Sequence, residues 1–386
     1  MPTHSQTGDT GPLRESARVT SLDLIRGVAV LGILMMNAVA FRFGLGPYFN
    51  LNAGGSETWL DWSVGFFGEI FIDQKFMGLF SLLFGAGMIL FIDRASASGK
   101  RALGLNLWRN TLLLLIGVLH TLLWEGDVLI VYALSSVFLI VLRKLPNRVL
   151  ISCGVVIFGL SVWSAVLAQQ IADTTDLSLT GIWDAGHMVP ATEETIGLIG
   201  GLGYFLRALG LILIGAGLYR SGFMGGGLPA RAYRLTAATG IALGLPLAVA
   251  SVIVAAAHGY SRDIAFVGQI PNTLSTIPLS LGYMSIIIIW NNHTDNWLKR
   301  RLRAVGRMAL TNYLTQTVMG VFVLTILLRD ADFVNRSAVL VFVFTVWALQ
   351  LWWSDAWLNR FLYGPAEWLW RVGTYRSNQP FRRPRL

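Results

Sequence analysis

Long apolar runs separated by short polar segments follow one another along this chain from residue 24 onward. Each run is near the length of about 20 residues that a helix needs to cross a bilayer. The runs cover residues 24–43, 75–93, 106–124, 127–143, 148–170, 195–220, 233–257, 269–291, 307–328 and 336–357. The pattern predicts an all-α, polytopic membrane protein with about ten transmembrane helices.

Residues 57–72 form one more apolar segment, rich in tryptophan and phenylalanine. A full crossing here would invert every later loop, so we expect a lead-in helix that re-enters the membrane or lies at its outer face. It joins the second span through Asp73, Gln74 and Lys75. A break at membrane depth is tolerated where it is buried or lines a cavity.

Lysine and arginine concentrate in alternate loops and in the C-terminal tail, whereas the acidic residues between 173 and 194 fall in one loop of the other set. The positive-inside rule assigns the basic loops to the cytoplasm. We therefore expect both termini to be cytoplasmic. Residues 1–20 are predicted to be a disordered N-terminus, residues 21–357 the transmembrane domain, and residues 358–386 an interfacial C-terminal segment.

Composition agrees with this class. Of the 386 residues 54% are hydrophobic and only 13% are charged, which is about half the charge of soluble proteins. The net charge of +9 comes from the basic residues of the loops assigned to the cytoplasm, so it does not predict nucleic-acid binding. The single cysteine, Cys153, excludes intrachain disulfides and a cysteine zinc site. No spacing of ligating residues predicts a metal, and the absence of a P-loop motif argues against an ATP-driven pump.

The first span carries a polar stripe. Asp23 and Arg26 are three residues apart and lie on one face of a helix. Asn37 follows Arg26 by 11 residues, about three turns and roughly 16 Å along nearly the same face. Polar groups at such depth are costly in lipid and usually mark a functional site.

The third span repeats that spacing with Arg109 and His120. We expect His120 near the outer end of this span, either as a proton acceptor or as a hydrogen-bonded structural histidine. Glu125 in the following loop is a candidate to orient His120, or is simply a solvated loop carboxylate. Asp127 is expected to cap the fourth span.

Further polar residues interrupt the apolar runs. Glu69 and Asp73 share a helical face, and Lys75 is expected to pair with one of them, which either holds the break or forms part of a site. Arg207 lies in the middle of the sixth span and must face a partner or an anionic ligand. Asn312 and Gln316 share a face of the ninth span, suited to a ligand or to a neighbouring helix.

Five segments together resemble the YeiB family of bacterial inner-membrane proteins (domain of unknown function 418). They are Ser21–Gly27 with Asn37, Lys75–Gly85, His120 with Trp124–Leu129, Gly306–Gln316 and Gly364–Arg371. The resemblance covers about residues 20–376. It implies a multi-pass protein of the bacterial inner membrane.

The opening Asp-x-x-Arg-Gly helix is also similar to that of transmembrane acyltransferases, such as the acyltransferase-three proteins and the lysosomal heparan-glucosaminide acetyltransferase. Those enzymes pass an acyl group from cytoplasmic acyl-CoA to a hydroxyl or amine on the far side of the membrane, using an intramembrane histidine. By this resemblance Asp23 and Arg26 match the opening motif, and Asn37 falls where those enzymes carry an asparagine or histidine. His120 has no counterpart in that motif.

We therefore predict a membrane acyltransferase with acyl-CoA as donor and a small-molecule, glycan or lipid acceptor. The predicted donor-binding residues are Arg26, Arg307, Asp23 and Arg109. The predicted catalytic residues are His120 as general base, Asn37 as hydrogen-bond donor to the acyl carbonyl, and Glu125. The predicted substrate path contains Glu69, Asp73, Lys75, Arg207, Asn312 and Gln316.

Two other interpretations stay open at this stage. One is a transporter or channel for a small polar or anionic solute, favoured by the break at Asp73–Lys75 and by Pro271 and Pro278 in the eighth span. The other is a membrane scaffold in which the polar residues serve packing alone. The basic run Lys299–Arg307 is consistent with phosphate binding or with topology alone.

Overall fold

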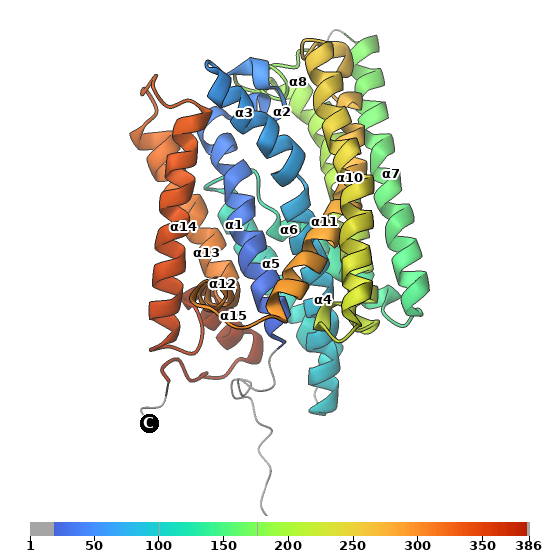
Figure 1. Ribbon diagram of the computed structural model, residues 1–386, viewed down its shortest axis with the longest axis vertical. Coiled ribbons are helices and arrows are strands. Elements are labelled where there is room, and N and C mark those ends of the chain that lie inside the picture. The colour runs from blue at the N-terminus through green and yellow to red at the C-terminus, as the bar shows by residue number, and fades with distance from the viewer. Residues whose placement is uncertain (1–18, 100, 176, 384–386) are drawn as a thin grey trace, which may run out of the picture.

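The computed structural model describes residues 19–383 apart from residues 100 and 176. The predicted disordered N-terminus therefore falls almost wholly outside the described residues. Within them the chain is a bundle of helices without strands, and α1 runs through its middle (Figure 1). The long helices are α1 (Thr20–Phe43), α4 (Lys75–Ala97), α5 (Ala102–Thr121), α7 (Asn147–Thr174), α9 (Leu198–Arg220), α10 (Ala230–Ala257), α11 (Ile270–Asn291) and α14 (Arg336–Leu358).

Shorter helices complete the bundle. They are α2 (Leu45–Phe49), α3 (Trp59–Phe67), α6 (Leu129–Leu142), α8 (Pro190–Thr192), α12 (Trp297–Arg307), α13 (Ala309–Gly320) and α15 (Pro365–Tyr375). Stretches of π-helix follow α3 (Gly68–Ile72), precede α9 (Glu193–Gly197) and continue α13 (Val321–Leu327). Such stretches frequently occur at functional sites.

Nine helical segments of the described chain are long and apolar enough to cross a membrane, which confirms a multi-pass protein. One of them, Trp59–Ala97, unites the lead-in helix with the predicted second span. The lead-in helix is thus neither a separate surface helix nor a separate re-entrant one, because it descends from the upper end of the bundle and continues into α4 (Figure 1). The two parts meet at Asp73 and at Gln74, whose φ of 62° is left-handed.

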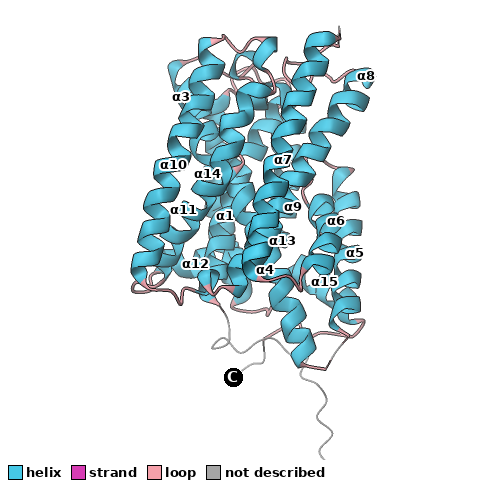
Figure 2. Cartoon of the chain, turned by 90° about the vertical axis from the view of Figure 1, so that its right-hand side faces the viewer, coloured by secondary structure: helices cyan, strands magenta, loops and turns pink. Residues whose placement is uncertain are grey.

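The expected fourth span is shorter than predicted. Residues 127–143 form α6 with 14 residues, about 21 Å long, whereas the bilayer core is about 30 Å thick. Helices α5 and α6 pair in the lower part of the bundle, and their turn does not reach its upper end (Figure 2). The expectation of ten full-length helices is therefore corrected to nine plus this short one.

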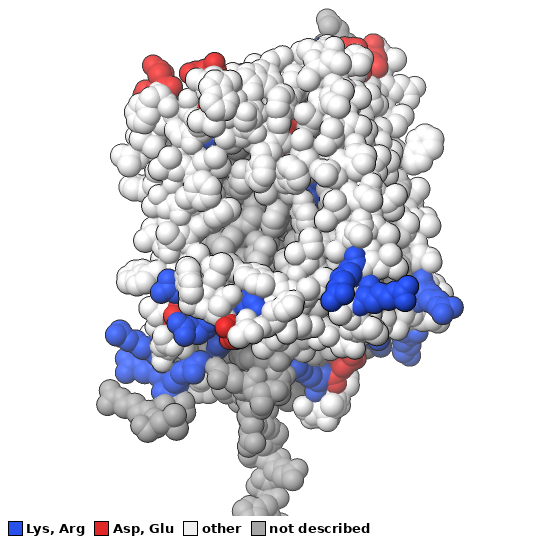
Figure 3. All heavy atoms as spheres, in the orientation of Figure 1, with Lys and Arg blue, Asp and Glu red and all other residues white. Residues whose placement is uncertain are grey.

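Charge is distributed unevenly between the two ends of the bundle. In Figure 3 lysine and arginine side chains gather at the lower end, and aspartate and glutamate side chains at the upper end. We call the lower end, which carries α12, the basic end. The positive-inside rule would make it cytoplasmic; that orientation stays a prediction.

Helix α12 lies across the basic end and is seen end-on in Figure 1. The basic run Lys299–Arg307 that forms most of it was not expected to be a helix. Asn296 caps the helix by accepting a hydrogen bond from the Lys299 amide at 2.9 Å, and Leu302 and Val305 bury its apolar side. The arginines of this run are therefore held close to the ends of α1 and α13.

Small residues, Gly85 in α4 and Gly215 in α9, allow these two helices to cross closely. A Cβ atom on Gly85 would lie 2.0 Å from the Ile212 carbonyl oxygen, and one on Gly215 would lie 2.0 Å from the Leu82 carbonyl oxygen. Each glycine thus admits the backbone of the other helix.

Replacing Gly85 by alanine is expected to lower the thermal unfolding temperature, because its methyl group would force the two backbones apart. Gly87 on the same helix has open space at its Cβ position. Gly87→Ala is therefore the matched control, and it should be neutral or slightly stabilising, since alanine favours helix by up to about 1 kcal/mol over glycine. Equal unfolding temperatures of the two variants would contradict the close crossing.

Candidate functional site

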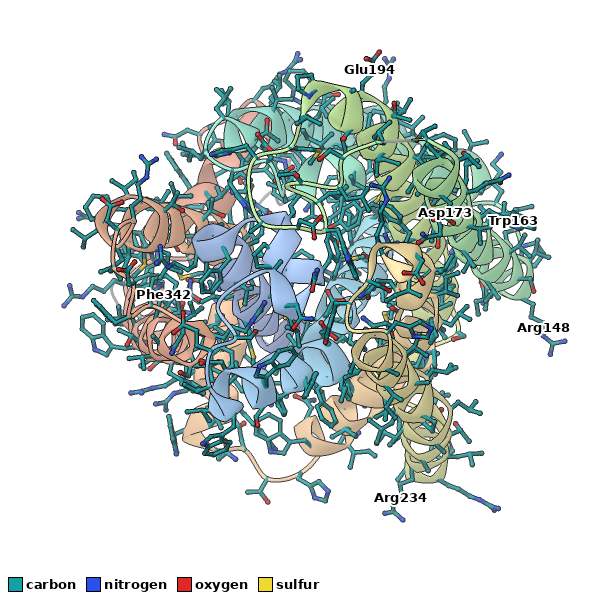
Figure 4. The ribbon with its side chains drawn as sticks, turned by 90° about the horizontal axis from the view of Figure 1, so that it is seen from above. Arg148, Trp163, Asp173, Glu194, Arg234 and Phe342 are labelled. Carbon is teal, nitrogen blue, oxygen red and sulfur yellow. The ribbon has the colours of Figure 1, made fainter. Side chains whose placement is uncertain are left out.

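Two cavities lie one above the other inside the bundle. The lower cavity, of about 220 Å³, is near the basic end, and the upper cavity holds about 520 Å³. Both are lined by Ile33 of α1, Val128 at the start of α6 and Tyr313 of α13. We call these three residues the septum. In the view from above (Figure 4), the segment between α7 and α9 crosses over the centre of the bundle, and its residues Ile182, Trp183 and Met188 line the upper cavity.

Three predicted donor-binding arginines line the lower cavity. Arg26 comes from α1, Arg109 from α5 and Arg307 from the end of α12. The Arg109 guanidinium lies between the rings of Phe91 and Trp370, at 4.6 and 4.1 Å from their centroids. Apolar side chains form the wall from the arginines up to the septum: Phe80, Leu83, Phe84, Met88, Leu113 and Leu129. Positive charge at one end and an apolar wall above it suit an anionic molecule with an apolar arm.

Asp23 does not line the cavity and lies behind Arg26. Its Oδ1 atom is 3.4 Å from the Arg26 Nη1 atom, so the predicted one-face pairing is confirmed. Both side chains are still partly accessible to solvent, which limits the contribution of the pair to stability.

Helix α15 closes the basic end of the lower cavity. The Glu367 carboxylate accepts hydrogen bonds from the backbone amides of Leu310 (2.7 Å) and Thr311 (3.1 Å) and from the Thr311 hydroxyl (2.5 Å). It thereby caps the N-terminus of α13 with a side chain from another helix. The Trp370 indole donates to the Arg109 carbonyl at 2.8 Å.

Burial raises the pKa of Glu367, against the lowering effect of its hydrogen bonds. A carboxyl whose pKa is higher in the folded state binds more protons when folded, so its contribution is fully present at low pH and is lost as the pH rises through the folded pKa. As the pH rises from 4 to 8, we expect the unfolding temperature of the wild type to fall more than that of Glu367→Gln, because glutamine does not titrate. Thermal unfolding measured from pH 4 to 8 checks this, and parallel curves would contradict it.

His120 lies beside the septum with both ring nitrogens engaged. Its Nδ1 atom is 2.8 Å from Asp127 Oδ1 and its Nε2 atom is 2.9 Å from the Thr317 hydroxyl. In the neutral tautomer with its proton on Nδ1, His120 donates to the Asp127 carboxylate and accepts from the Thr317 hydroxyl at Nε2. The other Asp127 oxygen accepts from the Ile130 amide at 2.9 Å, which confirms the predicted cap of α6. Nucleophile, base and orienting carboxylate adopt this order in hydrolytic triads.

His120 lies in the last turn of α5, at the end of its span as predicted. Its partner Thr317 lies eight residues after the start of α13 and ten before the end of the π-helix that continues it. This end of α5 lies near the middle of the bundle, because the short α5–α6 pair does not reach the upper end (Figure 2). The side chain is only 3% exposed.

Asn37, Asp73, Glu125 and Arg207 all line the upper cavity. Glu125 does not orient His120 as was suggested, since Asp127 occupies that position. It is an exposed residue on the floor of the cavity, where the α5–α6 turn faces upward. Asn37 reaches the cavity one helical turn above Ile33, on the same face of α1.

A buried hydrogen-bond network holds the break between α3 and α4. The Lys75 ammonium donates to the Glu69 carbonyl at 2.8 Å and to the Asn272 side-chain oxygen. The Asn272 amide donates to Asp73 at 2.8 Å, and Asp73 also accepts from the Tyr48 hydroxyl at 2.5 Å.

Lys75 thus reaches Asp73 through Asn272 rather than by the direct pairing that was predicted. Arg207 donates to the Gln74 side chain at 2.9 Å and so fixes the left-handed residue of the break. Lys75 lines neither cavity, and Glu69 faces a separate small pocket together with Arg336.

Asn312 and Gln316 join helices and line neither cavity. The Asn312 amide donates to the Val305 carbonyl (3.2 Å) and to Ser354 of α14 (3.0 Å). The Gln316 amide donates to the Val30 carbonyl of α1 (3.1 Å) and to Gln350 of α14 (2.8 Å). Of the two sequence interpretations, contact with neighbouring helices is the one that the geometry shows.

Several site residues were not singled out from the sequence. They are Tyr313, Thr317 and Glu367. Each belongs to or follows an apolar segment, and its sequence context alone did not indicate a functional role for its hydroxyl or carboxylate. Their signal is position: Thr317 follows Tyr313 by one helical turn, which puts both on the face that meets His120. In the described part of the chain no group of three or more histidine, cysteine or acidic side chains is arranged to hold a metal.

These features define a class: an all-helical, multi-pass membrane protein with charged residues around two stacked cavities. Comparison with known proteins supplies the family. The family described as "Protein of unknown function (DUF418)" matches residues 218–377. The uncharacterized protein YeiB of Escherichia coli (strain K12) is 33% identical over 94% of this chain and 98% of its own length.

The chain therefore belongs to the YeiB family. The uncharacterized protein YxaH of Bacillus subtilis (strain 168) is 28% identical over 96% of this chain and 97% of its own length. No solved structure matches the chain.

Proposed function

We propose that this protein is a membrane acyltransferase that passes an acyl group from acyl-CoA in the lower cavity to an acceptor in the upper cavity. The observation that carries the proposal is the septum, where the two cavities share Ile33, Val128 and Tyr313 beside His120. A donor and an acceptor that enter from opposite sides meet there without either crossing the membrane.

The lower cavity supports the donor side. Arg26, Arg109 and Arg307 are suited to phosphate groups, because guanidinium binds phosphate through paired hydrogen bonds. The apolar wall above them suits the thioester arm. If the basic end is cytoplasmic, as the positive-inside rule predicts, the cavity opens on the side where acyl-CoA is made.

The upper cavity supports the acceptor side. Its carboxylates Asp73 and Glu125, with Asn37 and Arg207, are able to hydrogen-bond a hydroxyl or amine. Asn37 lines only the upper cavity, so we assign it to the acceptor rather than to the acyl carbonyl. His120 is the proposed general base, and Asp127 fixes the orientation of its ring. The Thr317 hydroxyl would relay the proton of the acceptor to Nε2 of His120.

Binding of acetyl-CoA to purified protein in nanodiscs tests the proposal. Arg26→Gln is expected to raise the dissociation constant about tenfold or more, since a hydrogen bond to a charged group contributes about 1.5–3 kcal/mol. Arg234→Gln is the matched control, because Arg234 lies on the outside of α10 and points away from the bundle (Figure 4). Failure of the wild type to bind acetyl-CoA in calorimetry would exclude the acyltransferase.

Transport of a small polar or anionic solute is the second candidate. It is favoured by the broken α3–α4 segment, whose residues Asp73 and Gln74 face the upper cavity beside Arg207. Saturable flux into liposomes that contain the protein, without acetyl-CoA binding, would support transport instead.

A further inference from the structure

Tyr313 is the septum residue that carries a reactive group. Its side chain is 4% exposed and lines both cavities, and its ring centroid lies 5.1 Å from that of His120. Its hydroxyl donates no hydrogen bond within the described residues, and the Val128 backbone amide, which can only donate, is the hydrogen-bonding group beside it. Buried tyrosine hydroxyls usually have a partner, so this donor is positioned for a group that enters one of the cavities.

Two other buried tyrosines show that the situation of Tyr313 is particular. Tyr132 also lines the lower cavity, but its hydroxyl lies 2.9 Å from that of Ser81. The Tyr260 hydroxyl has no partner in the described chain, but that residue lines neither the upper nor the lower cavity. Tyr313 alone among these three combines a hydroxyl that donates no hydrogen bond with a position at the meeting point of the cavities.

We propose that the Tyr313 hydroxyl donates a hydrogen bond to the carbonyl oxygen of the donor thioester at the septum and makes Tyr313 a catalytic residue. This inference rests on the proposed acyl transfer. A donor placed where negative charge develops stabilises the transition state more than the ground state. The two cavities share the septum residues, so a thioester carbonyl that reaches the septum from the lower cavity would face an acceptor in the upper cavity.

The step balances as an ordinary acyl transfer. The acceptor oxygen or nitrogen forms a bond to the thioester carbon, and its proton moves through Thr317 to Nε2 of His120. The carbonyl electron pair shifts onto oxygen, which is stabilised by the Tyr313 hydroxyl while that hydroxyl keeps its proton. The carbon–sulfur bond then breaks, and the CoA thiolate takes the proton from His120 and stays in the lower cavity.

Infrared difference spectroscopy with acetyl-CoA labelled with ¹³C at the thioester carbonyl tests this inference in nanodiscs. A hydrogen bond moves the carbonyl band to lower frequency, so the bound wild type should show a band below that of free acetyl-CoA. Tyr313→Phe should bring the band back toward the free position while acetyl-CoA still binds, and Tyr132→Phe should leave it unchanged. Removal of one such donor is expected to lower kcat about 10²–10³-fold.

The outcomes separate the inference from the proposed function. Bound acetyl-CoA with an unshifted band in the wild type, or a shift that survives in Tyr313→Phe, overturns the role of Tyr313 and leaves acyl transfer standing. No acetyl-CoA binding by the wild type overturns both. If Tyr313→Phe does not fold, 3-fluorotyrosine at position 313 replaces it: a more acidic hydroxyl should move the band further down, and an unmoved band overturns the inference.

Discussion

Replacing His120 by glutamine is expected to lower acyl transfer about 10²–10⁴-fold, the contribution of general acid–base catalysis. Glutamine can keep one hydrogen bond, to Asp127 or to Thr317, but cannot accept a proton. Acetyl-CoA binding should persist, because His120 lines neither cavity. The measurement is transfer of label from ¹⁴C-acetyl-CoA into endogenous acceptors by membranes that contain the protein.

His258→Gln is the control for this experiment. His258 is exposed at the end of α10, and its side chain is hydrogen-bonded to the Val254 carbonyl of that helix, so its replacement should leave transfer unchanged. Full transfer by His120→Gln would sink the assignment of His120 as base. Loss of both transfer and acetyl-CoA binding would instead indicate a structural histidine.

Replacing Lys75 by methionine is expected to destabilise the protein by about 3–5 kcal/mol, the usual cost of removing one partner from a buried charged group. Lys75 is fully buried, and its loss leaves the Glu69 carbonyl and Asn272 without their donor and Asp73 without its nearest ammonium. Thermal or denaturant unfolding in detergent measures the effect. Lys144→Met is the control, since Lys144 is an exposed lysine in the turn between α6 and α7.

A second substitution sharpens the Lys75 experiment. If charge balance is the main effect, Lys75→Met combined with Asp73→Asn should lose less stability than the sum of the two single variants. Unfolding of Lys75→Met at the same temperature as Lys144→Met would show that the network does not hold the break.

Hydropathy predicted most of the bundle because a transmembrane helix is a local feature of about 20 residues. Hydropathy did not predict features that depend on contacts between helices. The length of α6 looked sufficient, since 127–143 is continuously apolar, yet Asp127 and Val128 form the cap and turn rather than the helix. As a result, the end of α5 that carries His120 lies inside the bundle and not at its upper end.

The site was predictable where polar residues share one helix and not where several helices combine. Asp23 with Arg26 followed from spacing, and so did the placement of Arg26 and Arg109 near one end. The pairing of His120 with Thr317, 197 residues away, depends on where the end of α5 meets α13 in the folded bundle. For Asn312 and Gln316 the sequence could not distinguish a ligand-binding role from helix packing, since both use the same amide side chains.

The septum also has an electrical consequence. We expect water in the two cavities to concentrate the membrane potential across these few side chains instead of across the full bilayer. Moving one elementary charge across the septum would then change the free energy by about 2.3 kcal/mol for each 100 mV of membrane potential. An acyl group is neutral, so the potential would have almost no effect on the free energy of its passage. The phosphates of CoA would remain on the side of Arg26 throughout. The septum would thus allow a neutral acyl group to pass between the cavities while it blocks ions. Acyl transfer across the membrane would then leave the membrane potential unchanged.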